Sequence, residues 1–266
     1  MRTLIVGTGK MGTALARGLV ETGTMQSTDL FGVDPSPEAR TAFVEATGAQ
    51  ASGPDPAVLG TAEVLLLAVK PQIAAGVARD IGGALGEPLI LSIAAGIRLR
   101  SLSEWFDSSR VVRVMPNTPM QIGRGASAFA CAAGVTEADR GLIERILESV
   151  GVAREVPEDQ MDAVTALSGS GPAYVFEVIE GMTRAAEALG LRREDALELA
   201  AHTVRGAAEM VVSACGEPEE LRNAVTSKGG TTAEGLRVLA ERDLRGILQD
   251  ALGAAKRRSV ELGGGG

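Results

Sequence analysis

Two glycine-rich loops, more than two hundred residues apart, have the composition of anion-binding sites in this 266-residue chain. The first is GTGKMG at residues 7–12, and the second is TSKGGTTAEG at residues 226–235. Each runs straight into a helical pattern, and backbone N–H groups at a helix N-terminus bind phosphates and carboxylates. The pair therefore predicts two sites, one for a cofactor and one for an anionic substrate.

The first loop is a G-x-G-x-x-G pattern that follows an apolar run at residues 3–7. Gly7 permits a tight turn, Gly9 lets the backbone approach a pyrophosphate, and Gly12 lets the helix pack on the sheet. A plain strand–turn–helix with convenient glycines would give the same letters. The complete strand–helix–strand context favours dinucleotide binding.

Asp34 follows Gly12 by 22 residues, at the end of the expected second strand. An acid there accepts hydrogen bonds from a ribose 2′-hydroxyl and repels a 2′-phosphate, so it slightly favours NADH over NADPH. Ser36 and Arg40 could still host a 2′-phosphate if the Asp34 side chain turned away. Alternatively, Asp34 only starts a turn with Pro35.

Two further strand ends present residues on the side where cofactors lie in such sheets. AVKPQ at 68–72 turns at Pro71, and Lys70 there either touches a ribose or is solvated. MPNTP at 115–119 presents Asn117 from a loop stiffened by two prolines. The residues expected at the cofactor are Gly7, Thr8, Gly9, Lys10, Met11, Gly12, Asp34, Ser36, Ala68, Val69, Lys70, Pro71 and Asn117.

In the second loop, Thr231 and Glu234 have the T-x-x-E spacing of a capping box, which predicts a helix that begins just after Thr231. Gly229 and Gly230 leave the preceding backbone uncrowded, and Ser227 adds a hydroxyl. The alternative is a plain capped helix after a flexible turn.

The secondary-structure elements that must position these loops differ between the two halves of the chain, because the pattern of apolar residues changes at about residue 158. Apolar runs at 3–7, 29–34, 63–71, 88–96 and 110–119 alternate with helical stretches, which predicts a Rossmann-like doubly wound parallel α/β sheet. Late strands are expected at 125–134 and 152–157. The predicted domains are a dinucleotide-binding domain at 1–157 and a helical substrate-binding domain at 158–266.

The second half is expected to be all-helical, with helices at 171–190 and 193–215. Pro172 sits where the first can start, and Gly190 where it can stop. The second helix is apolar nearly all round, which is typical of a buried helix. Dimerisation through these helices is the expected solution, and an ordinary helical bundle is the alternative. The closing GGGG at 263–266 is read as a flexible tail or as a remnant of cloning.

Composition limits which classes of binding partner and which cellular compartment we expect for the protein. A formal net charge of −8 argues against nucleic acid, and 45% apolar residues suffice for a packed core. With one histidine (His202) and two separated cysteines, no metal site or disulfide framework is expected, and Cys131 and Cys215 are read as buried small hydrophobes. The N-terminus lacks a signal-peptide pattern, and no apolar run approaches a membrane span. We expect a soluble cytoplasmic protein.

Several motifs together resemble pyrroline-5-carboxylate reductase, the last enzyme of proline biosynthesis, over essentially the whole chain. They are GTGKMG, AVKP, SIAAGI, RVMPNTP, DAVTALSGSGPAYVF, AAHTVRGAAEMV and TSKGGTTAEGL, in this order. The resemblance implies a Rossmann-like domain and a helical domain that interlocks with a second subunit. It also implies an active site at the dimer interface, with the late loop facing the nicotinamide of the neighbouring chain.

Carried over by that resemblance, Ser227, Gly230 and Thr231 match positions that hold the substrate carboxylate. Thr232 matches the hydroxyl that hydrogen-bonds the ring nitrogen. The family commonly has proline at the position of Lys228 and glutamine at that of His202. Lys228 either strengthens carboxylate binding or points to solvent, and His202 is expected to be a packing residue.

Reduction of a cyclic imine needs no strong protein acid, since the substrate nitrogen can carry its own proton, so positioning and one hydroxyl can suffice. A β-hydroxyacid dehydrogenase needs a general base, usually a lysine on the first long helix after the Rossmann domain. Residues 158–212 contain no lysine. A non-catalytic dinucleotide sensor would have no reason to keep a second anion loop.

Overall fold

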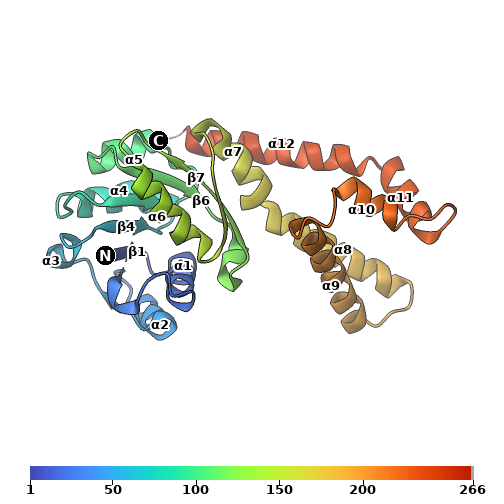
Figure 1. Cartoon of the computed structure of the whole chain (residues 1–266), viewed down its shortest axis with the longest axis horizontal. Coiled ribbons are helices and arrows are strands. Elements are labelled where there is room, and N and C mark those ends of the chain that lie inside the picture. Colours follow the sequence, from blue (N-terminus) through green and yellow to red (C-terminus); the bar gives the residue numbers. More distant parts are fainter. Residues whose placement is uncertain (265–266) are drawn as a thin grey trace. The chain divides into compact units, whose positions relative to one another are not determined.

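In the computed structural model, which describes residues 1–264, the first half is an eight-stranded sheet with helices on both faces (Figure 1). Its strands run in the order β3-β2-β1-β4-β5-β6-β7-β8. The strands are β1 (Thr3–Val6), β2 (Leu30–Val33), β3 (Gln50–Ser52), β4 (Val64–Leu67), β5 (Leu89–Ser92), β6 (Val111–Met115), β7 (Gly125–Cys131) and β8 (Gly151–Glu155). All neighbours pair in parallel except β6 and β7. The predicted Rossmann-like doubly wound sheet is therefore confirmed.

The helices of this half are α1 (Lys10–Glu21), α2 (Pro37–Thr47), α3 (Pro56–Leu59), α4 (Pro71–Gly82), α5 (Leu99–Phe106), α6 (Glu137–Glu148) and α7 (Met161–Val164). The short 3-10 helices are η1 (Ser27–Asp29), η2 (Thr118–Ile122) and η3 (Glu158–Gln160), and η4 (Thr165–Gly169) is a π-helix.

The central strands alternate between two hydrophobic cores, because successive side chains of a strand point to opposite faces. One core joins Ile5 of β1 to Leu15 of α1 and Ile143 of α6. The other joins Leu4 of β1 to Ile81 of α4, together with side chains of α3 and α5. Burial on both faces explains why these strands read as continuous apolar runs.

The second half is helical, with α8 (Gly171–Ala188), α9 (Arg193–Val212), α10 (Pro218–Ala224), α11 (Thr231–Glu241) and α12 (Leu244–Gly263). Gly190 has a φ of +101°, a left-handed conformation that suits glycine at the end of α8. In the single chain, α9 buries only Ala196 and Ala200.

Grouped by their contacts, the described residues form two compact units. The sheet unit comprises Met1–Ser170 together with the chain from Ala254 onward, and the helical unit comprises Gly171–Gly253. The last turns of α12 thus return to the first unit. Gly263 belongs to that helix, so the tail expected from residue 263 is wrong at this position, and Gly265 and Gly266 lie outside the described residues.

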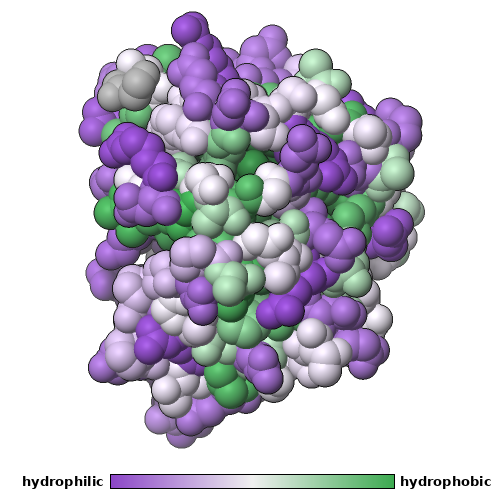
Figure 2. Space-filling view, turned by 90° about the vertical axis from the view of Figure 1, so that its left-hand side faces the viewer, coloured by the Kyte–Doolittle hydropathy of each residue, from purple (hydrophilic) through white to green (hydrophobic). Residues whose placement is uncertain are grey.

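Exposed large apolar side chains concentrate in the helical unit. They include Phe176 at 64%, Leu189 at 87% and Val212 at 79% exposure. On the face drawn in Figure 2, by contrast, apolar side chains form small patches broken by polar ones. Among the described residues, no helix combines the length and apolar character needed to cross a membrane.

Candidate functional site

Close backbone packing fixes the first glycine loop at the end of β1. Gly7 has a φ of +98°, and a Cβ there would lie 2.6 Å from the Ala68 carbonyl oxygen. A Cβ on Gly12 would lie 2.2 Å from the Gly7 carbonyl oxygen, so α1 can pack against the loop only with glycine at this position. Gly9 differs, because a Cβ there would meet nothing within 4 Å. Gly7 and Gly12 shape the loop, whereas Gly9 borders open space.

The N-terminus of α1 offers donors to an anion. Gly9 is the N-cap and gives no side-chain hydrogen bond, so the first amides of the helix have no capping side chain. The buried Thr8 hydroxyl has no hydrogen-bond partner within the part of the chain that the structure describes. Uncapped amides, an orphaned hydroxyl and an open Gly9 together fit a pyrophosphate group.

Asp34 is tied to the glycine loop. Its Oδ2 accepts a hydrogen bond from the Thr8 N–H at 2.9 Å, and its Oδ1 accepts one from the Ser36 N–H at 2.9 Å. A carboxylate has about four lone-pair sites, so acceptor capacity remains for a ribose hydroxyl. Ser36 caps α2 by accepting from the Ala39 N–H at 3.1 Å. Arg40 Nη1 donates to the Asp34 carbonyl oxygen at 2.7 Å.

The remaining residues predicted at the cofactor follow β4 and β6, which run in the same direction as β1. Ala68 and Val69 follow β4, Lys70 is the exposed N-cap of α4, and Pro71 begins that helix. Asn117 follows β6 and is nearly buried, and its Oδ1 accepts a hydrogen bond from the Ala126 N–H at 2.9 Å. The carboxyl ends of parallel strands lie at the same end of a sheet. The structure therefore brings these residues to the end that carries the glycine loop.

The second loop lies in the helical unit and differs from its predicted form. The capping box is absent: α11 begins at Thr231 itself, and Gly230 is an N-cap with extended backbone and no side-chain cap. Glu234 instead accepts a hydrogen bond from Arg237 Nε at 3.0 Å. Because glycine occupies the N-cap, Thr231 falls inside the helix, where its hydroxyl cannot cap. The first amides of α11 are therefore left for another acceptor.

Ser227 and Gly230 close this loop on itself. The Gly230 N–H donates to the Ser227 carbonyl oxygen at 3.1 Å, and a Cβ on Gly230 would lie 2.3 Å from Ser227 Oγ. Gly229 takes a φ of +72°. Thr231 is exposed and Thr232 half-buried, so the structure brings the four predicted residues together around one helix start.

Two expectations about side-chain burial were wrong for the single chain. Cys215 is exposed, whereas Cys131 is half-buried and burial raises the pKa of its thiol. His202, expected to be a packing residue, is exposed on α9, and Lys228 is exposed as well. Within residues 1–264, no group of three or more His, Cys, Asp or Glu side chains is arranged to hold a metal ion.

Gly169 and Met115 also meet, although neither was among the predicted site residues. A Cβ on Gly169, in the π-helix, would lie 2.3 Å from Met115 Cε at the end of β6. A π-turn often marks a functional position. The small-residue run SGSG could have pointed to such a close approach.

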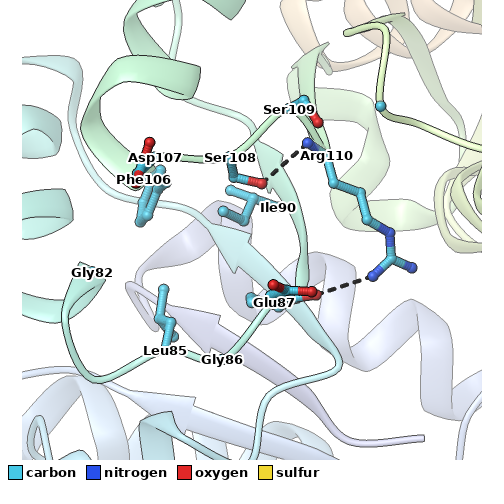
Figure 3. Close-up of a pocket in the computed structure, with 12 residues that line it drawn as sticks. Gly82, Leu85, Gly86, Glu87, Ile90, Phe106, Asp107, Ser108, Ser109 and Arg110 are labelled. Carbon is cyan, nitrogen blue, oxygen red and sulfur yellow. Dashed lines mark hydrogen bonds between the residues drawn. The ribbon is translucent and has the colours of Figure 1, made fainter.

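A cavity of about 320 Å³ lies at the opposite edge of the sheet, where β5 and β6 begin (Figure 3). Its guanidinium, from Arg110, already donates to the Asp139 carboxylate at 3.0 and 2.5 Å and to the Glu87 carbonyl oxygen at 3.1 Å. Hydrogen bonds from Arg110 hold the pKa of the Asp139 carboxyl well below its usual range. The cavity is thus distinct from the glycine-loop edge, and its charged group serves the fold.

Two family models match separate parts of the chain. Residues 2–96 match NADP oxidoreductase coenzyme F420-dependent, and residues 158–262 match pyrroline-5-carboxylate reductase dimerisation. The first match identifies a domain that binds a nicotinamide dinucleotide, and the second supports a homo-oligomer.

Similar proteins carry one name. Pyrroline-5-carboxylate reductase of Pisum sativum is 38% identical over 97% of this chain and 94% of its own. The Pseudomonas aeruginosa protein of that name is 39% identical over 98% and 96%.

Solved structures agree with these similarities. A pyrroline-5-carboxylate reductase from Coxiella burnetii matches with a TM-score of 0.93 and 34% identity, covering 98% of both chains. The Plasmodium falciparum structure with NADP bound matches with a TM-score of 0.87 and 31% identity, covering 99% and 98%. Prephenate dehydrogenase from Aquifex aeolicus, at 16% identity and a TM-score of 0.54, shares the fold alone.

We expect Gly9→Ala to fold normally and to bind NADH about tenfold more weakly or worse, a loss of about 1.4 kcal/mol or more. The added methyl meets no protein atom but occupies the space beside the uncapped amides. Fluorescence titration with NADH and thermal melting would measure both effects. Gly76→Ala, in α4 with equally open surroundings, is the matched control. Unchanged affinity in Gly9→Ala would mean that the pyrophosphate lies elsewhere.

Proposed function

Because the chain belongs to the pyrroline-5-carboxylate reductase family, we propose that it reduces 1-pyrroline-5-carboxylate to L-proline with NADH or NADPH. One observation carries this proposal: two helices, α1 and α11, each begin at an N-cap glycine without a side-chain cap. Two such helix starts suit two anionic ligands, a dinucleotide and a carboxylate substrate.

The cofactor would be held at the carboxyl edge of the sheet, and when bound it supplies the hydride. Backbone N–H groups of residues 7–12 would hold the pyrophosphate, and Asp34 and Ser36 would lie at the adenosine ribose. Residues 68–71 and Asn117 would border the other end of the dinucleotide. With a carboxylate facing the ribose, we retain the slight preference for NADH.

The substrate would be held by the second loop. Ser227, Gly230 and Thr231 would bind its carboxylate, since the N–H groups at the start of α11 are uncapped. Thr232, in the first turn, would place its hydroxyl at the ring nitrogen. Lys228 is exposed beside these residues and adds positive charge.

Beyond placing the substrate and the cofactor, the protein needs no acid group for imine reduction. The iminium carbon accepts the hydride, the ring nitrogen keeps its proton, and Thr232 would stabilise that nitrogen as its charge changes. A related imino-acid reductase would use the same groups. A β-hydroxyacid dehydrogenase is less well supported, because residues 158–212 contain no lysine to act as base.

We also propose that two copies associate through the helical unit as a homodimer or a higher homo-oligomer. In the single chain this unit exposes large apolar side chains such as Phe176, Leu189 and Val212. Monomeric proteins rarely leave wide apolar areas in water.

The direct test is a spectrophotometric assay of the purified protein with pyrroline-5-carboxylate and each reduced cofactor. We expect oxidation of NADH or NADPH with formation of proline. A folded sample that binds nucleotide but turns over neither cofactor would contradict the proposal.

Asp34→Ser should shift the ratio of kcat/KM values toward NADPH by about tenfold, or ~1.4 kcal/mol. Removing the carboxylate removes its repulsion of a 2′-phosphate and frees the Ser36 N–H, with Arg40 nearby. Steady-state kinetics with both cofactors measure the ratio. Asp34→Asn is the matched control for the loop, because its amide oxygen can still accept from the Thr8 N–H. An unchanged ratio in both variants would mean that Asp34 does not face the ribose.

Thr232→Ala should lower kcat about ten- to a hundredfold, while nucleotide affinity stays near that of the wild type. Losing one hydrogen bond to a charged group costs about 1.5–3 kcal/mol, and a bond that strengthens in the transition state appears in kcat. Steady-state kinetics, nucleotide titration and circular dichroism are the measurements. Thr232→Ser should keep most activity, and Thr203→Ala, an exposed threonine of α9, should be silent. Wild-type kinetics in folded Thr232→Ala would leave the loop as a plain turn.

A further inference from the structure

A buried ion pair joins the middle of β6, in the sheet unit, to the segment that follows β8. Arg113 of β6 is 3% exposed, and its Nη2 donates to Asp162 Oδ1 at 3.4 Å. Its Nη1 stands 3.7 Å from Glu158 Oε1 and makes no hydrogen bond among the described residues. Such an imperfectly satisfied buried pair contributes little net stability, so stability alone does not explain it.

The last turns of α12 join this pair. Ser259, 6% exposed, donates from its Oγ to Asp162 Oδ1 at 2.8 Å, across 97 residues of chain. Arg98 stands 3.9 Å from Asp162 Oδ2 and donates from Nε to the Gly263 carbonyl oxygen at 3.3 Å. We call Arg98, Arg113, Glu158, Asp162 and Ser259 the polar latch.

Both covalent connections to the helical unit lie close in sequence to residues of the polar latch. The chain passes into that unit after Ser170 and returns from it at Ala254. Asp162 lies shortly before the first crossing and Ser259 shortly after the second. One hydrogen bond therefore joins the two connections, and Arg113 fastens them to the strand that leads to Asn117.

We propose that Asp162 and Ser259 are positioning residues for hydride transfer. This inference rests on the proposed function, in which the cofactor and the substrate loop belong to different units. A single flexible connection would allow one unit to rotate relative to the other. Two connections joined by a hydrogen bond restrict that rotation. Hydride transfer is sensitive to small misplacements of the reacting atoms, so loosening the polar latch slows turnover and leaves each binding loop intact.

The test compares Ser259→Ala with Ser259→Thr, which keeps the hydroxyl. We expect Ser259→Ala to lower kcat about tenfold, with the NADH dissociation constant and the KM for pyrroline-5-carboxylate within about twofold of wild type. Ser259→Thr should recover most of the loss. Arg258→Gln is the control, since this neighbouring arginine is exposed and, among the described residues, forms an ion pair with Glu261 alone.

Hydrogen–deuterium exchange gives a readout independent of substrate. In Ser259→Ala, amides of 161–170 and 254–264 should exchange about tenfold faster, while those of β1 to β5 keep their rates. Wild-type kcat in Ser259→Ala, even with a lowered Tm, would overturn the proposal and leave a structural contact. So would unchanged exchange.

If Ser259→Ala does not fold, Arg98→Gln takes its place, because this half-exposed arginine holds both Asp162 and Gly263. The same loss of kcat supports the proposal, and wild-type kcat overturns it. If the wild-type protein does not reduce pyrroline-5-carboxylate, the proposed function fails, and the exchange rates alone then decide whether the polar latch holds both connections.

Discussion

The close approach of three backbone segments at the end of β1 is the constraint on which the sheet unit depends. No side chain fits between Gly7 and the Ala68 carbonyl, or between Gly12 and the Gly7 carbonyl. These contacts bring the N-terminus of α1 against the sheet edge, where the Asp34 carboxylate accepts from the Thr8 N–H. With glycine at these positions, the unpaired amides of α1 come to the edge at which parallel strands end, and a dinucleotide can bind there.

Most of the sheet could be predicted because burial on both faces leaves a local signature, the continuous apolar run. The strand β3 lacks that signature: its three residues, QAS, are exposed or half-exposed, and it pairs only with β2 at the sheet edge. The antiparallel pairing of β6 with β7 follows from the short connection through η2, and its direction is not encoded in either strand's own residues.

In the candidate site, too, features that depend on neighbouring residues could be predicted from sequence, and features that depend on distant residues could not. Glycine positions in both loops could be predicted from sequence, because the approaches of Gly12 to Gly7 and of Gly230 to Ser227 act over a few residues of chain. The capping box at Thr231 and Glu234 failed because the local pattern allows two N-cap positions, and Gly230 took the one that leaves Glu234 free for Arg237. The bond between Ser259 and Asp162 joins residues 97 apart, so no spacing pattern could reveal it.

The helical unit has little hydrophobic core of its own, so its stability and position depend on contacts and connections outside it. In its two longest complete helices, α8 and α9, the buried residues are Thr183, Ala196 and Ala200. Small units bury too little surface to be stable alone, and the proposed association with another copy would bury these helices further. Besides the proposed association, two covalent connections restrain the unit. A polar latch that pins both connections to β6 would then complete the restraint, with Asn117 only four residues beyond Arg113.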